Sequence, residues 1–256
     1  MMEFSAAVRK IVLAIGLMAA VVPVAQVSAS PGWFAGERVH GSGTIVKQAR
    51  EVGAFEGLEL GMPGSVEVRI GGSDNVTIEA DDNLQPLIET VIEGGTLKIR
   101  PVRKELQITS RNMKIFITAR RLDSISVGGS GNVDAEGLRG QRLSFNVGGS
   151  GSINVRGLES ESVKVSLGGS GNLKASGHTD HLAVSIGGSG KVGTGQLASR
   201  NVSVSIGGSG QATVWAKQSL SVSVAGSGDV SYYGDPQISK SIMGSGSIRR
   251  LSGAPQ

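Results

Sequence analysis

A short phrase, Gly-Gly-Ser-Gly, recurs through the second half of the chain and constrains the fold more than any other feature. It occurs, with two weakened copies at the end, at Gly128–Gly131, Gly148–Gly151, Gly168–Gly171, Gly187–Gly190, Gly207–Gly210, Ala225–Gly228 and Met243–Gly246. The serines of successive copies are 20, 20, 19, 20, 18 and 18 residues apart. A period of this size is typical of a solenoid, in which each repeat forms one coil.

Aliphatic and polar residues alternate on both sides of each Gly-rich phrase. Three residues before the motif serine stand Val127, Val147, Leu167, Ile186, Ile206, Val224 and Ile242, and three residues after it stand Val133, Ile153, Leu173, Val192, Ala212, Val230 and Ile248. The position five residues before the serine is also apolar, except at Lys240, and the position between is always Ser or Asn. Alternation with a period of two predicts short strands on either side of a tight corner. We therefore predict an all-β fold, a parallel β-helix or solenoid with about 18–20 residues per coil and a narrow aliphatic core.

The start of the chain has the composition of a secretory signal. Arg9 and Lys10 form a positive region, an apolar run follows over residues 11–25, and Val27–Ala29 is a small-residue cleavage site. The alternative is an uncleaved anchor, for which the run falls short of the roughly 20 residues that span a bilayer. We expect an exported protein, located in the periplasm, on the outer surface or outside the cell, with no transmembrane segment after signal cleavage.

Composition limits the partners of the mature chain. The chain has no Cys, so an exported form has no disulfide to stabilise it and depends on backbone pairing and apolar stacking. Removal of the signal leaves 23 basic and 20 acidic residues, a formal charge of +3. Because no cluster of Lys and Arg is interleaved with aromatic residues, we expect no nucleic-acid partner.

Four parts of the chain are expected. Residues 1–29 form the signal peptide, residues 30–42 a linker, residues 43–120 an irregular β-rich portion, and residues 121–256 the Gly-Gly-Ser-Gly solenoid. The irregular portion contains alternating apolar runs separated by Gly-rich turns, and a short helical turn is expected near Pro86. It either caps the solenoid or contributes irregular coils to it.

The Gly-rich phrase resembles two ligand loops but lacks their chemistry. A phosphate loop requires a following helix and a Lys-Ser/Thr pair, and a calcium roll requires an Asp two residues beyond the last Gly, where this chain has aliphatic residues. His178 and His181 have no third His or Cys near them, and the motif serines have no nearby base. We therefore predict no metal site, no cofactor and no catalytic residue.

One outward position carries polar or small residues in the early repeats and large apolar residues in the last three. Six residues after each motif serine stand Glu136, Arg156, Ser176, Gly195, Trp215, Tyr233 and Leu251. If the alternation continues to this position, Trp215, Tyr233 and Leu251 stack on adjacent coils as an exposed apolar stripe. Such stripes bind a sugar face, a partner protein or a second subunit. The alternative is that another segment of the chain, such as Trp33–Phe34, covers the stripe.

Serines also recur as Ser-x-Ser pairs on the outward side of the predicted strands. The pairs are Ser124/Ser126, Ser203/Ser205, Ser221/Ser223 and Ser239/Ser241. A flat array of hydroxyl groups can order water, as in ice-binding solenoids. Lys164 and Ala183 interrupt the array, and Thr would add a methyl group that Ser lacks.

The order of these motifs resembles a known family. The matching features are Phe55–Leu58, Gly64–Val66, Ala80–Leu84, Gly94–Ile99 and the Gly-Ser-Gly array. They are similar to the head GIN domain family, described as "putative auto-transporter adhesin" heads, over residues 43–250. The resemblance implies an exported right-handed parallel β-helix and transfers no catalytic or binding residue.

Together these features predict a non-enzymatic, exported β-solenoid that acts as an envelope or cell-surface adhesion and binding scaffold. Its expected partners are a glycan, a surface protein or a second copy of the chain, held through Trp215, Tyr233 and Leu251. The alternative is a carbohydrate-active β-helix enzyme that acts on polysaccharide. Clustered outward carboxylates in a groove would favour the enzyme, because glycoside cleavage requires paired acids or an acid with a Lys or Arg base.

Overall fold

The computed structural model describes residues 37–110 and 112–253, and most of them belong to β-strands. The predicted signal peptide, residues 1–29, lies outside the described residues, as does most of the predicted linker. Within residues 37–110 and 112–253, no helix is long and apolar enough to span a bilayer.

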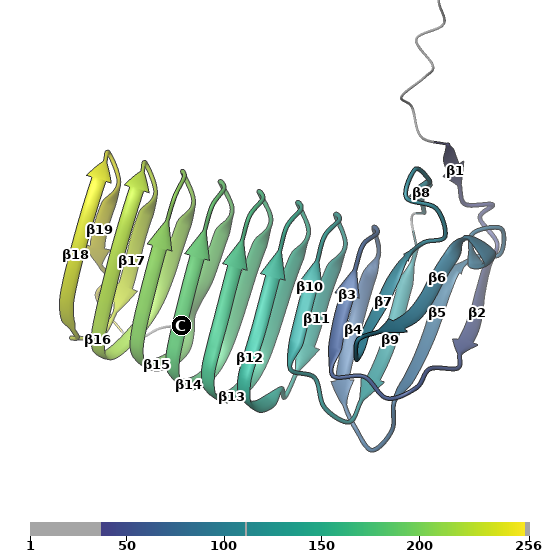
Figure 1. Cartoon of the computed structure of the whole chain (residues 1–256), viewed down its shortest axis with the longest axis horizontal. Helices are drawn as coiled ribbons and strands as arrows, with labels where there is room; N and C mark the ends of the chain where they lie inside the picture. The colour runs from purple at the N-terminus through teal and green to yellow at the C-terminus, as the bar shows by residue number, and fades with distance from the viewer. Residues whose placement is uncertain (1–36, 111, 254–256) are drawn as a thin grey trace, which may run out of the picture. The chain divides into compact units, whose positions relative to one another are not determined.

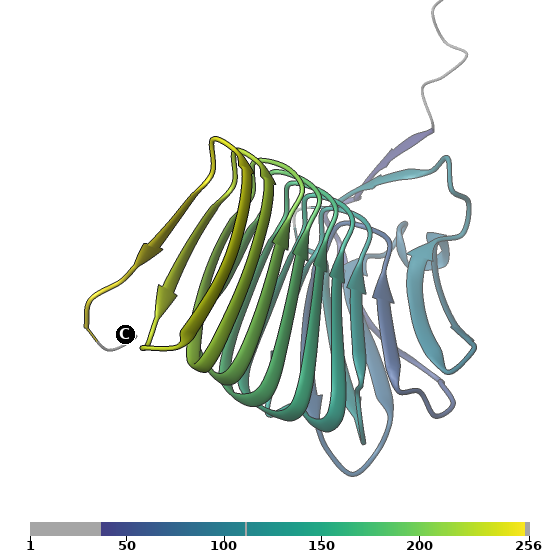
Figure 2. The same cartoon turned by 60° about the vertical axis from the view of Figure 1, so that its left-hand side comes forward.

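The repeats form stacked parallel coils, as the sequence predicts (Figure 1). The strands of this part are β10 (Ser124–Val127), β11 (Asn132–Glu136), β12 (Arg139–Val147), β13 (Ser152–Leu167), β14 (Asn172–Ile186), β15 (Lys191–Ile206), β16 (Gln211–Gly226), β17 (Asp229–Tyr233), β18 (Gln237–Gly244) and β19 (Ser247–Arg250). Like positions pair between coils; for example, Ser166 pairs with Ser185, and Ser185 with Ser205. Each of β13 to β16 continues from one Gly-rich corner to the next, so the two short strands expected on either side of the far bend merge into one (Figure 2).

The Gly-rich phrase forms the tight corner between the two faces of each coil. Its first glycine donates a backbone hydrogen bond to the preceding coil; Gly207 N–H, for example, donates to the Ile186 carbonyl at 2.8 Å. The second glycine lies against the carbonyl of its counterpart one coil earlier, and a Cβ atom on Gly208 would be 2.6 Å from the Gly188 oxygen. Coils stack this closely only because no side chain separates them.

The core is the narrow aliphatic stack that the alternation predicts. From β10 to β17, the residues three before, five before and three after each motif serine are at most 3% exposed. The last coil differs because no coil covers it: Ile242 is 38% exposed, and Lys240 stands where earlier coils have an aliphatic residue. A charged residue at that edge opposes further strand addition.

The irregular portion is joined to the repeats in one 17-stranded sheet. Its elements are β1 (Arg38–His40), β2 (Ile45–Arg50), β3 (Gly57–Leu60), β4 (Ser65–Ile70), β5 (Asn75–Asp81), the 3₁₀ turn η1 (Gln85–Leu87), β6 (Ile88–Glu93), β7 (Thr96–Pro101), β8 (Gln107–Thr109) and β9 (Lys114–Ala119). Strands β3 and β4 form a coil that pairs in parallel with β10 and β11 on one side and with β7 and β9 on the other. The coil formed by β7 and β9 therefore follows the coil of β3 and β4 in the sequence, but it lies farther from the repeats than that coil does.

Antiparallel strands cover this end of the stack. Strand β6 pairs with β7, β5 pairs with β9, and β2 pairs with β5, each antiparallel. The expected helical turn is present as η1, although its N-terminus has no side-chain cap. The Asp81 carboxylate instead accepts hydrogen bonds from Gly43 N–H at 2.8 Å and from the Ser110 hydroxyl at 2.6 Å. Strand β1, which lies in the predicted linker, pairs in parallel with β8, and these two strands form a separate two-stranded sheet.

Candidate binding groove on the outer face

A break in strand register marks one place on the outside of the stack. The coil that contains β15 is 20 residues long and the next coil is 18, so their strands cannot remain in register throughout. Thr194 pairs with Val214, but the next paired residues are Ala198 and Trp215. The three residues between Thr194 and Ala198 have no paired residue on β16, although Gln196 and Leu197 still pair with β14. Bulges often occur at functional sites because they redirect side chains and open the local surface.

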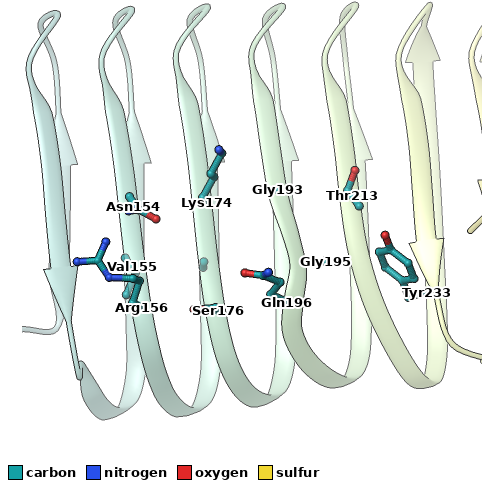
Figure 3. A pocket seen from close by; sticks show the side chains of 11 residues that line it. Asn154, Val155, Arg156, Lys174, Ser176, Gly193, Gly195, Gln196, Thr213 and Tyr233 are labelled. Carbon is teal, nitrogen blue, oxygen red and sulfur yellow. The ribbon is translucent and has the colours of Figure 1, made fainter. Parts of the chain in front are cut away.

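A groove of about 400 Å³ lies along this bulge and the coils before it (Figure 3). We call it the Tyr233 groove, and its lining residues are Asn154, Val155, Arg156, Lys174, Ala175, Ser176, Gly193, Gly195, Gln196, Thr213 and Tyr233. These residues come from β13 to β17, so five consecutive strands contribute to it. The groove exists because the side chains at Ser176, Gly193 and Gly195 are small or absent, whereas Arg156 and Tyr233 at its two ends are large.

Tyr233 forms one wall of the groove. Its ring extends from β17 across β16, and its Cε2 atom lies 3.1 Å from where a Cβ atom of Gly195 would be. The side chain is half-buried, and the Cδ2–Cε2 edge of the ring lies over Gly195. Beneath it, the buried Thr194 hydroxyl donates a hydrogen bond to the Thr213 carbonyl at 3.0 Å, which fixes β15 to β16 where the register breaks.

The opposite wall carries positive charge. Arg156 on β13 and Lys174 on β14 both line the groove, and the eleven lining residues include no carboxylate. The nearest recorded ion pair joins Arg156 Nη1 to Asp134 Oδ1 at 3.9 Å, a long contact, and the Asp134 oxygen also accepts a 2.8 Å hydrogen bond from Asn154. Among the described residues, no carboxylate lies within ion-pair distance of Lys174. Both cations are therefore available to a ligand.

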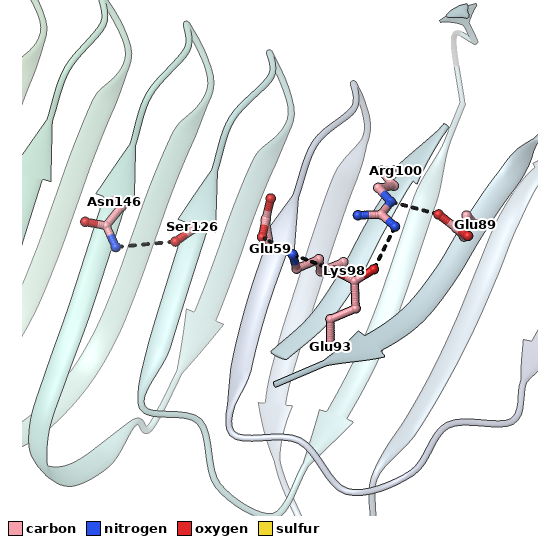
Figure 4. Close-up of polar contacts among 7 residues, drawn as sticks. All are labelled: Glu59, Glu89, Glu93, Lys98, Arg100, Ser126 and Asn146. Atoms are coloured by element: carbon pink, nitrogen blue, oxygen red, sulfur yellow. Dashed lines mark hydrogen bonds and ion pairs between the residues drawn. The ribbon is translucent and has the colours of Figure 1, made fainter. Parts of the chain in front are cut away.

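Some other cations of the same sheet are neutralised by close partners. Beside the first coil, Lys98 lies 2.8 Å from Glu93 and 3.6 Å from Glu59, and Arg100 contacts Glu89 and Glu93 at 2.7 and 2.8 Å (Figure 4). Hydrogen bonds from Lys98 and Arg100 hold the pKa of the Glu93 carboxyl below its ordinary value. Exposed ion pairs of this kind contribute little stability but leave no unpaired charge for a ligand.

The three residues predicted to form a stripe lie on adjacent coils, Trp215 on β16, Tyr233 on β17 and Leu251 directly after β19. Trp215 pairs in register with Tyr233, and Leu251 N–H donates to the Tyr232 carbonyl at 2.8 Å. All three members, Trp215, Tyr233 and Leu251, are half-buried, and only Tyr233 lines the groove. The Lys217 ammonium lies 5.3 Å from the centre of the Trp215 ring, which places a cation over it. Trp33–Phe34, the segment considered as a cover, lies outside the described residues.

The groove residues that sequence reasoning missed come from a second outward position. Lys174, Gly193 and Thr213 stand four residues after their motif serines, next to the position that carries Tyr233. The change from a 20-residue to an 18-residue step was the available signal, because unequal coils require a bulge. The direction of the Tyr233 ring is a matter of packing that the repeat pattern does not specify.

The opposite outer face carries the predicted hydroxyl array. Serines pair in register across β15, β16 and β18; the six exposed ones are Ser203, Ser205, Ser221, Ser223, Ser239 and Ser241. Ice binding by this array stays a prediction, which a thermal hysteresis measurement tests. His178 and His181 lie exposed on β14, and the described residues contain no group of three or more His, Cys, Asp or Glu that would hold a metal ion.

The stacked coils and their exterior groove define the class of the protein, a parallel β-solenoid, a fold that presents extended binding surfaces. Within that class, the chain belongs to the head GIN domain family, whose profile, described as "Putative auto-transporter adhesin, head GIN domain", matches residues 54–236. This finding confirms the resemblance read from the sequence. A comparison with curated proteins finds no match.

Solved structures share the fold over most of the chain. A "putative adhesin" from Bacteroides fragilis is 28% identical, with a TM-score of 0.78 over 83% of this chain and all of that one. A "putative lipid binding protein" from Parabacteroides distasonis is 26% identical, with a TM-score of 0.71 over 84% of this chain and all of that one. A second "putative adhesin" from the same species is 20% identical with a TM-score of 0.66, and it supports the fold alone.

Proposed function

We propose that the protein is exported and acts at the cell envelope or surface as a non-enzymatic binding scaffold, with the Tyr233 groove as its ligand site. One observation carries the proposal: the outer face between β13 and β17 has an open groove with an aromatic wall, beside the break in register between β15 and β16. A regular ladder of small polar side chains offers a ligand the same weak contacts everywhere. A groove with a fixed ring offers apolar area and shape in one place.

The ligand that we favour is a carbohydrate. A half-buried ring that is held from below has already lost most of its conformational freedom, so a sugar face can stack on it at little further entropic cost. The groove is open along the coils, and polar side chains such as Asn154, Ser176 and Gln196 line it beside the ring. An elongated chain can therefore lie across several coils. The similar solved structure that is 28% identical is named an adhesin, which agrees with a binding role.

The composition of the groove supports binding over catalysis. Glycoside hydrolysis uses two carboxyl groups on either side of the scissile bond. The lining of the Tyr233 groove has no carboxylate, and Asp134, which contacts two of the lining residues, is engaged by Arg156 and Asn154. We therefore expect glycans to leave the groove unchanged, which mass spectrometry of a glycan incubated with the protein tests directly.

The test of the binding role is a double substitution, Trp215→Ser with Tyr233→Ser. The variant should lose binding on a glycan array and attachment to cell surfaces, because it removes the ring and its neighbour on the adjacent strand. A matched control is Val102→Ser, which removes an exposed apolar side chain near the capped end, where Val102 is 45% exposed. Unchanged glycan binding, surface attachment and oligomeric state in the double variant would sink the proposal.

Export is tested separately, by determining the first residue of the mature chain. Edman sequencing or mass spectrometry of protein recovered from the envelope or the medium should find Ser30 as the first residue. Recovery of the full-length chain from the cytoplasm alone would contradict export.

A further inference from the structure

The charges in the Tyr233 groove specify the ligand more narrowly than the aromatic ring does. Arg156 and Lys174 line the groove from adjacent strands, which are about 4.8 Å apart. Lys174 pairs with Asn154, so Arg156 stands two residues farther along β13. Each is exposed, and Arg156 has a side chain that is 57% exposed with a single long ion pair to Asp134. Two cations without close carboxylates form a site for an anionic group, and the planar guanidinium suits a carboxylate or sulfate that accepts two hydrogen bonds.

The cations and the ring are placed to contact one ligand at the same time. The Tyr233 ring lies over Gly195 on β15, which is one strand away from Lys174 and two strands away from Arg156. The backbones of Lys174 and Arg156 are thus about one and two strand spacings from Gly195, roughly 5–10 Å. The Arg156 guanidinium extends from β13 toward the preceding coil, so a ligand that contacts both it and Tyr233 must be elongated (Figure 3). Between them the floor consists of Ser176, Gly193 and Gly195, which leave room for a ring that carries a charged substituent (Figure 3).

The shape of the groove argues against an acyl chain. A lipid tail requires an enclosed apolar cavity, because its stabilisation comes from apolar area removed from water. The lining here includes Asn154, Ser176 and Gln196 as well as the two cations, and the groove opens on the outer face of the sheet. An acidic, hydroxylated chain supplies countercharge to the two cations, whereas an acyl chain would cover both charges without compensating them.

We infer that the ligand is an acidic oligosaccharide, with a sugar ring against Tyr233 and its carboxylate or sulfate held by Arg156 and Lys174. This inference rests on the proposed binding function of the same groove and adds the charge of the ligand. It also requires that affinity fall as salt is added, because both cations are exposed to screening.

The experiment compares acidic glycans with matched neutral forms by isothermal titration calorimetry on the full mature chain. The pairs are a galacturonate hexasaccharide with its methyl ester, and a chondroitin sulfate hexasaccharide with its desulfated, carboxyl-reduced form. At least one acidic member should bind tenfold or more tightly than its neutral partner, and the arm that binds identifies the acid as carboxylate or sulfate.

Variants then assign the effect to the groove. Arg156→Gln and Lys174→Gln should each weaken binding of the acidic ligand about tenfold, the effect of losing a charge-assisted hydrogen bond. The matched control is Lys164→Gln, which removes an exposed cation from the opposite outer face and should leave affinity unchanged. All three positions are exposed, so circular dichroism should report folded protein in each case.

Three other results overturn the inference, and they separate it from the binding role. Equal affinity for acidic and neutral glycans, with loss of both in Tyr233→Ser, rejects the acidic ligand and retains the scaffold. Binding to vesicles that contain phosphatidylglycerol, with no glycan binding, replaces the glycan with a lipid. No binding to any probe, together with unchanged surface attachment of Tyr233→Ser, rejects both the inference and the proposed function.

Discussion

Substitution of a single glycine in one Gly-rich corner tests how closely the coils stack. A Cβ atom on Gly208 would lie 2.6 Å from the Gly188 carbonyl oxygen, and that distance would have to increase to 3.0–3.4 Å. The obstacle is backbone that is itself hydrogen-bonded, since Gly207 N–H donates to the Ile186 carbonyl at 2.8 Å next to it. Overpacking of this kind costs about 1–3 kcal/mol. We therefore expect Gly208→Ala to lower the unfolding temperature by about 2–12 °C, because a domain of this size loses roughly 2–4 °C per kcal/mol.

The matched control lies one residue earlier in the same corner. A Cβ atom on Gly207 meets nothing closer than the Ile186 oxygen at 3.9 Å, and neither glycine has a positive φ angle. Gly207→Ala should therefore be neutral or raise stability by up to about 1 kcal/mol, because it restricts the unfolded chain. Differential scanning calorimetry measures the unfolding temperatures of the two variants and tests this difference. Equal unfolding temperatures would refute the claim that the glycine contact between coils limits the stack.

Three further predictions concern charge, the groove and the open end of the stack. Hydrogen bonds from Arg120 lower the pKa of the Asp74 carboxyl below its ordinary 3.8. The ionised carboxylate therefore stabilises the fold above that pH, and this contribution is lost as the pH falls toward the lowered pKa. Asp74→Asn should reduce the acid destabilisation measured by unfolding at pH values from about 6 to 2. Gly193→Leu should fill the groove and abolish glycan binding without unfolding the protein, as titration calorimetry and circular dichroism would show, because a Cβ atom there meets only an ordinary 3.6 Å contact. Lys240→Val should cause concentration-dependent self-association in analytical ultracentrifugation, because it makes the uncovered last coil apolar, and a variant that remains monomeric would contradict this role.

The coil architecture follows directly from the sequence because its causes are local. The alternation around each corner places Val127 and Ile125 inward and Ser126 outward, and the structure confirms these directions. The glycine corners set the period, and stacking of like residues sets the register. These relations hold within one repeat and its neighbour, which is the range that a repeating pattern describes.

The capped end and the groove depend on relations that the pattern does not contain. Strands β7 and β9 pair with β3 and β4 on the side away from the repeats. The order of these coils in space therefore differs from their order in the sequence. The groove depends on a mismatch of two residues between coils and on the direction of the Tyr233 ring. Sequence reasoning selected Tyr233 by its position among the repeats, but it could not identify Lys174 as lining the same groove.

A crystal structure of the mature protein with an acidic oligosaccharide, such as the galacturonate hexasaccharide, tests the central claim most directly. The account predicts a sugar ring stacked on Tyr233, with its acidic group within hydrogen-bond distance of Arg156 or Lys174. A ligand bound on another face, or a groove that stays empty at a ligand concentration that saturates binding in solution, would contradict it.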